Sequence, residues 1–131
     1  HYEVRYPSHA LIKAVFTPAG TGGEDGLLHP KTFIMDSYNF MTPVTEKTTR
    51  YYWFQLRNIR PGDEALSKMM SEDVRTAFEE DRAVLNEVQI GLDEKTSPHI
   101  DLPIDGGQLR FRRQLQAMIN EEREVDAQMA Q

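Results

Sequence analysis

The segment TAFEEDRAVLNEVQ, residues 76–89, places a carboxylate where its hydrophobic pattern calls for an apolar side chain. Apolar residues recur here at helical spacing, which predicts an amphipathic helix. At about 100° per residue, Val74, Phe78, Leu85 and Val88 all fall within about 60° of Asp81 on a helical wheel. Asp81 is therefore expected in the middle of the buried stripe.

Burying an unpaired carboxylate is costly, so Asp81 needs a proton, a charged partner or a cation. One interpretation is an ion pair with a sheet arginine such as Arg50 or Arg57, and a second is a position at the rim of a ligand cavity. The third is a metal ligand, which requires further ligands. The four histidines are not spaced to share a helix face with one another: His1, His9, His29 and His99.

Composition removes several classes of function. The chain has 131 residues, no cysteine and a net charge of -6, so disulfides, zinc–thiolate sites and iron–sulfur ligation within it are excluded. The acidic balance argues against nucleic-acid binding. We expect no membrane span and no signal peptide, and a cytoplasmic location. Because the chain begins at His1 rather than Met, we also expect it to be a fragment of a longer protein.

The elements that must position Asp81 follow from periodicity. Period-two alternation and β-branched or aromatic content predict strands within about residues 1–57, and helical periodicity predicts helices at about residues 64–94 and 108–125. Asp63 or Ser71 can cap the first helix. Strands followed by helices indicate an α+β fold with an antiparallel sheet, in a single domain over residues 1–131 that is expected to be partial.

Three segments in this order carry a resemblance: MTPVTEKTTRYYWFQLRN, then AFEEDRAVLNEVQ, then DGGQLRFRRQLQAMINEE. Together they resemble the C-terminal part of the catalytic domain of Rieske non-haem iron aromatic oxygenase alpha subunits, in the branch of vanillate O-demethylase and dicamba monooxygenase. The resemblance covers about residues 10–122. It implies a helix-grip (START/Bet v 1-like) fold, in which an antiparallel sheet packs on a long C-terminal helix.

The resemblance also implies a role for Asp81. In this family two histidines and one carboxylate hold a mononuclear Fe(II), with positions left open for oxygen and substrate. Asp81 in FEEDRAVL matches the carboxylate, which makes it the expected metal ligand and catalytic residue. The full chain would hydroxylate or O-demethylate an aromatic substrate with O2. Electrons would come from NAD(P)H through a reductase or ferredoxin to a Rieske two-iron two-sulfur cluster, and then to the iron of a neighbouring subunit in a homotrimer.

Two family motifs are missing from these residues. The family's iron-binding histidines come from an upstream D-x-x-H-x-x-x-x-H segment, and its Rieske cluster from Cys-x-His pairs nearer the N-terminus. We interpret their absence as truncation and expect the 131-residue piece to be inactive by itself. The alternative is a non-catalytic helix-grip module that binds a hydrophobic or aromatic small molecule, with Asp81 paired to a sheet arginine.

Candidate pocket residues follow from the expected positions of the helix and the strands. Phe78 and Leu85 lie one turn on either side of Asp81 and would line a cavity. Asn39 stands where some relatives carry a substrate-binding histidine, although an ordinary strand position near a turn would also explain it. Ile12 would face the same cavity or serve as a core residue. The run RFRR, residues 110–113, is interpreted as a solvated helix face.

Overall fold

The computed structural model describes residues 1–27, 29–94 and 100–130. The chain divides into two compact units. One unit contains His1–Ile59 and Pro103–Gln131, and the other contains Arg60–Leu102. The first unit holds a sheet and a helix, and the second holds one long helix.

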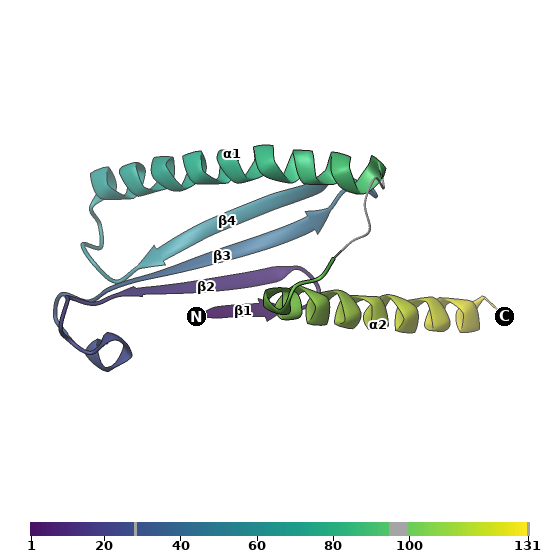
Figure 1. The fold of residues 1–131 in the computed structure, drawn as a ribbon, viewed down its shortest axis with the longest axis horizontal. Coiled ribbons are helices and arrows are strands. Elements are labelled where there is room, and N and C mark those ends of the chain that lie inside the picture. Colours follow the sequence, from purple (N-terminus) through teal and green to yellow (C-terminus); the bar gives the residue numbers. More distant parts are fainter. Residues whose placement is uncertain (28, 95–99, 131) are drawn as a thin grey trace. The chain divides into compact units, whose positions relative to one another are not determined.

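The first unit is built on a four-stranded antiparallel sheet (Figure 1). Its strands are β1 (Tyr2–Arg5), β2 (His9–Phe16), β3 (Phe33–Pro43) and β4 (Thr49–Arg57), and they lie side by side in chain order. Antiparallel neighbours of this kind need only short connections, as between β1 and β2 and between β3 and β4, whereas residues 17–32 connect β2 to β3. The α+β arrangement predicted from the order of strands and helices is confirmed.

Strand register separates the sheet into two faces. Ala10 of β2 pairs with Asn39 of β3, which pairs with Trp53 of β4. Directly paired residues share a face and neighbours along a strand alternate, so these three side chains share one face, which we call the Asn39 face. Ile12, two residues after Ala10, lies on it as well.

The opposite face of the sheet carries a row of stacked rings. The His9 and Phe40 ring centroids are 4.6 Å apart, and those of Tyr38 and Phe54 are 4.8 Å apart. Such aromatic pairs across neighbouring strands stabilise a sheet beyond the area that they bury. The ring row therefore explains why this aromatic sequence forms strands.

The helix of the first unit is α2 (Gly106–Met129), which follows a single 3-10 turn, η2 (Pro103–Asp105). Its first turns pack against the turn between β1 and β2, because the Tyr6 and Phe111 rings stack with centroids 5.3 Å apart. Figure 1 shows the rest of α2 running on past the end of β1. The helix begins two residues before the predicted start at residue 108 and ends four residues after the predicted end at residue 125.

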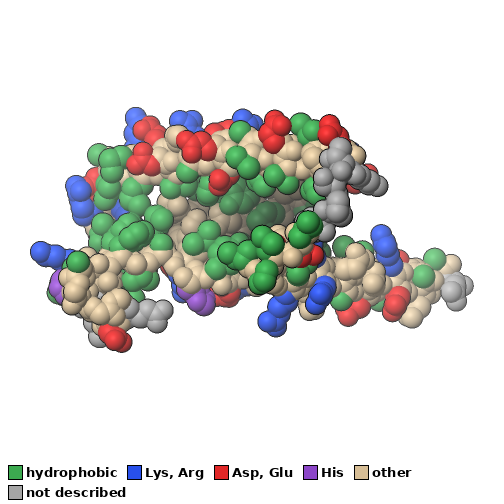
Figure 2. All heavy atoms as spheres, in the orientation of Figure 1, with side chains coloured by type: hydrophobic (Ala, Val, Ile, Leu, Met, Phe, Trp, Pro, Cys, Tyr) green, Lys and Arg blue, Asp and Glu red, His purple; other side chains and the backbone are tan. Residues whose placement is uncertain are grey.

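The second unit consists mainly of α1 (Glu64–Glu94), a helix of 31 residues that is about 46 Å long at 1.5 Å per residue. Its bounds are those indicated by the change to helical periodicity. Figure 2 shows charged side chains along one side of α1 and hydrophobic side chains along the other. Among the described residues, no helix combines the length and the apolar character needed to cross a bilayer.

Candidate functional site

A capped start fixes the position of Asp81 on α1. The Asp63 carboxylate accepts a hydrogen bond from the backbone N–H of Leu66, at 2.9 Å, which satisfies one of the free donors at the helix start. Arg60 forms an ion pair with the same carboxylate. Gly62 has a φ of 82°, a backbone conformation that favours glycine, and it turns the chain into the helix. Of the two predicted caps, the structure uses Asp63.

Asp81 lies near the middle of α1, with Phe78 three residues before it and Leu85 four residues after it. This spacing places the three side chains on one strip of the helix, as the sequence predicts. Phe78 is half-buried, whereas Asp81 is exposed and Leu85 is 64% exposed. Within α1 no described side chain pairs with Asp81, although its neighbour Glu79 forms an ion pair with Arg82 at 2.6 Å.

Asn39 occupies a different environment, because its side chain is 2% exposed within the sheet. Its Nδ2 donates to the carbonyl oxygens of Ala10, at 3.3 Å, and Ser37, at 3.1 Å. Its Oδ1 accepts a hydrogen bond of 2.7 Å from the Tyr51 hydroxyl. These bonds use both amide N–H donors, so Asn39 ties β2, β3 and β4 together. Ile12, on the same face, is 40% exposed.

The described residues contain no group of three or more His, Cys, Asp or Glu side chains that could hold a metal ion. His9 lies in the ring row, and its Nε2 is buried without a hydrogen-bond partner. His99 lies outside the described residues. The predicted site residues thus fall into two groups, with Phe78, Asp81 and Leu85 on α1, and Ile12 and Asn39 on the sheet. Asp81 is available as one ligand, not as part of a complete site.

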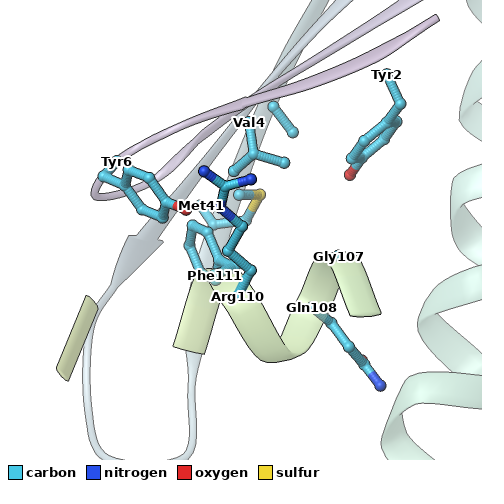
Figure 3. Close-up of a pocket in the computed structure, with 9 residues that line it drawn as sticks. Tyr2, Val4, Tyr6, Met41, Gly107, Gln108, Arg110 and Phe111 are labelled. Carbon is cyan, nitrogen blue, oxygen red and sulfur yellow. The ribbon is translucent and has the colours of Figure 1, made fainter. Parts of the chain in front are cut away.

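Sequence reasoning missed a cavity in the first unit. It has a volume of about 560 Å³ and lies between β1, the neighbouring ends of β2 and β3, and the first turns of α2 (Figure 3). Tyr2, Tyr6, Met41, Arg110 and Phe111 are among its lining residues. Arg110 and Phe111 belong to the run interpreted as a solvated face, in which the three arginines are exposed, as expected, and Phe111 is half-buried. The aromatic residue inside that basic run was the available signal for a packed helix start.

Comparisons with known proteins identify the chain's relatives. A family model described as the vanillate O-demethylase oxygenase C-terminal domain matches residues 1–121. The chain is 33% identical to a vanillate O-demethylase oxygenase subunit of Pseudomonas sp. (strain ATCC 19151), over 94% of this chain and 37% of the relative. It is 30% identical to a protein of the same name from Pseudomonas sp. (strain HR199 / DSM 7063), over 91% of this chain and 34% of that relative.

Another relative has a different named substrate. A toluene-4-sulfonate monooxygenase system iron-sulfur subunit of Comamonas testosteroni is 33% identical over 64% of this chain and 24% of the relative. No solved structure matches the chain at a significant level. The chain covers no more than 37% of the length of these relatives. Since the family model covers nearly all of it, the chain belongs to the family of vanillate O-demethylase oxygenase C-terminal domains.

Proposed function

We propose that this chain is the C-terminal part of the catalytic domain of an aromatic-ring hydroxylating or O-demethylating oxygenase, and that Asp81 supplies the carboxylate ligand of a mononuclear Fe(II). Membership of the family supports the first part, because relatives are named as oxygenase and monooxygenase subunits. The position of Asp81 on α1 carries the second part. It is an acid without a partner on its own helix, set between apolar residues.

The residues of this chain can supply one of the three protein ligands of such an iron site. A carboxylate is the oxygen ligand of the facial triad, in which two histidines and one acid leave open positions on Fe(II). Because no three-ligand cluster occurs among the described residues, the two histidines would come from a part of the longer protein outside this chain. When bound, the iron supplies activation of O2 beside the aromatic substrate.

The remaining cofactors and partners are proposed for the longer protein as well. The chain has no cysteine, so a Rieske two-iron two-sulfur cluster would have to be held elsewhere in the protein. One relative is named as an iron-sulfur subunit, which supports this assignment. We extend the proposal to electrons from NAD(P)H, delivered by a reductase or ferredoxin partner, and to a homotrimeric assembly.

The residues of this chain would hold the Asp81 carboxylate in position and exclude water from it. A long helix with a capped start holds the Asp81 backbone rigidly, and a ligand on a rigid element keeps its geometry better than one on a loop. Phe78 and Leu85, one turn away on either side, would exclude water around the carboxylate and strengthen its attraction to a cation.

Asn39 and Ile12 are the proposed substrate-pocket residues on the sheet. Both N–H groups of the Asn39 amide are already used within the sheet, so its contribution would be to orient Tyr51, whose hydroxyl donates to Asn39. Ile12, which is partly exposed on the same face, would offer an apolar contact to an aromatic ring.

The test is a pair of neighbouring substitutions in the full-length protein. Asp81→Asn keeps the side-chain size and removes the charge, so mononuclear iron and product formation should both be lost while the Rieske absorbance persists. Glu80→Gln makes the same chemical change one residue away, off the apolar stripe, and should leave both intact. Full iron content in the Asp81→Asn protein would contradict the proposal.

A further inference from the structure

The two halves of α2 carry charges of opposite sign. Residues 106–117 include three arginines and no acid, and residues 118–129 include four acids and one arginine. All of these charged side chains are exposed. Figure 2 shows basic side chains below the start of α2 and acidic side chains farther along the helix. The helix thus presents a positive half and a negative half to solvent.

These charges do not stabilise α2 as a single helix. Acidic side chains stabilise the start of a helix and basic side chains its end, yet α2 has no acid in its first turn and no base in its last turn. Four of the charged side chains form no ion pair within the part of the chain that the structure describes: Arg110, Arg113, Glu121 and Glu124. They are therefore available to a partner of matching charge.

The four charged residues are arranged symmetrically about Ala117. Arg113 and Glu121 each lie four residues from Ala117, and Arg110 and Glu124 each lie seven residues from it. At about 100° per residue, all four fall within about 40° of Ala117 around the helix axis. The five residues therefore form one strip along α2, with positive charges at one end and negative charges at the other.

We propose that this strip pairs with the same strip of a second copy of the chain, with the two α2 helices antiparallel across a two-fold axis at Ala117. Such an axis places Arg113 opposite Glu121 of the second copy, and Arg110 opposite Glu124 of the second copy, and each ion pair occurs twice. The small side chain of Ala117 at the axis would let the two helices approach closely, because interaxial distance depends on the side chains at the contact.

The strip is accessible and lies at the middle of the helix. Leu115 and Ile119, on the other side of α2, are half-buried, whereas Ala117 is exposed. Figure 1 shows the second half of α2 running past the end of β1. Because Ala117 is near the midpoint of α2 (Gly106–Met129), antiparallel copies would overlap over about 34 Å at 1.5 Å per residue.

This interaction goes beyond the proposed oxygenase function and does not depend on the iron ligand. Asp81 belongs to α1 in the other unit, and no residue of the strip does. The two proposals can therefore fail separately. Asp81→Asn protein that has lost mononuclear iron should still pair with the dissociation constant of the wild type.

Sedimentation velocity of the full-length protein at low and high salt tests the pairing. At low salt the wild type should form particles of doubled mass, because a two-fold contact doubles any assembly that forms through other surfaces. These particles should separate at high salt, where exposed charges are screened. Arg113→Glu places like charges opposite each other at two symmetric positions, so it should weaken pairing at low salt by at least about tenfold.

The decisive variant combines Arg113→Glu with Glu121→Arg, which restores opposite charges across the axis. Its dissociation constant should return to within about threefold of the wild type, because the two residues act as a pair. The matched control is Arg123→Glu, which makes the same change of charge on α2 outside the strip and should shift the dissociation constant by less than about twofold.

Three results would overturn the proposal. The first is a wild type with the same particle mass at both salt concentrations. The second is a double variant that pairs no better than Arg113→Glu alone, and the third is an equal loss of pairing in Arg123→Glu.

Discussion

The sheet and α1 differ in how much of their environment they supply for themselves. Asn39 is 2% exposed, and groups on its own strand and on both neighbouring strands satisfy its amide. No residue of α1 is buried, and Leu85 on its apolar stripe is 64% exposed. The buried amide of the sheet is therefore satisfied by groups of the sheet itself. The α1 helix presents an acid within an apolar stripe whose covering must come from outside the helix itself.

This difference bears on function, because a buried polar group that is already satisfied tends to be structural and an unsatisfied one is available for binding. Asn39 belongs to the first kind. Asp81, by contrast, is exposed on α1, and nothing on its own helix neutralises its charge. Four experiments, ordered by expected effect, would sharpen or break this contrast.

The largest effect is expected on the stripe of α1. Leu85→Lys in the full-length protein should lower the free energy of unfolding by about 2 to 5 kcal/mol, because it puts a charge on a stripe that we expect to be covered. Urea unfolding would measure the change. Glu87→Lys places the same residue on the polar side of α1 and should change stability by less than about 0.5 kcal/mol. If both variants were equally stable, the stripe would not be a covered surface.

Next in size is the buried amide. Asn39→Leu removes the hydrogen bonds of the buried amide with Ala10, Ser37 and Tyr51 and should cost about 1 to 3 kcal/mol, because each intramolecular hydrogen bond contributes about 0.5 to 1.5 kcal/mol. Tyr51→Phe removes only the hydroxyl and should cost less, about 0.5 to 1.5 kcal/mol. Trp53 is the single tryptophan of the chain and pairs with Asn39 from β4. Its fluorescence reports unfolding. Additive losses in the double variant would show that the two groups do not interact.

A smaller effect is expected at the start of α1. Asp63→Ala removes the hydrogen bond to the Leu66 N–H and should cost about 0.5 to 2 kcal/mol, the usual range for loss of an N-cap. Ser71, the other cap considered from sequence, lies inside the helix. Ser71→Ala should therefore be neutral or slightly stabilising, because alanine has the higher helix propensity. Circular dichroism during thermal unfolding distinguishes the two, and a larger loss in Ser71→Ala would contradict the assigned cap.

The smallest effect is at the exposed end of the sheet. Arg5 donates a hydrogen bond of 2.7 Å to the Glu3 carboxylate and holds the pKa of that group below its usual range. A lowered pKa means that the pair stabilises the fold above the unfolded-state pKa and that this contribution disappears as pH falls through the folded-state pKa. NMR titration of the Glu3 carboxyl should show a midpoint that rises toward the ordinary value in Arg5→Gln. An unchanged midpoint would show that the pair does not persist in solution.

Local patterns predicted the elements well, because period and capping act over a few residues. The bounds of α1 follow from its periodicity and from Asp63. The end of α2 was placed too early, since residues 120–124 contain no apolar side chain to mark the period. The helix α2 begins earlier than predicted because the η2 turn leads directly into Gly106 and Gly107.

Long-range features were harder to predict from the sequence. The burial of Asn39 depends on register with Ala10 and Trp53, which lie 29 and 14 positions away. Such pairing is set by strand alignment and leaves no local signal. The half-burial of Phe111 was missed for a similar reason, because a helical wheel of α2 alone does not show that Tyr2, Tyr6 and Met41 converge on its first turns. The role of Asp81 came from its place in the apolar stripe together with family resemblance, and it stays a prediction.

The central claim, that Asp81 binds iron, is tested most directly by a crystal structure of the full-length protein loaded with Fe(II), with the metal located by anomalous scattering. If Asp81 is a ligand, one of its carboxylate oxygens should lie about 2.0 to 2.6 Å from the ion, the range for hard cations and carboxylates. Iron ligated entirely by other side chains, with Asp81 turned to solvent or paired with an arginine, would contradict it.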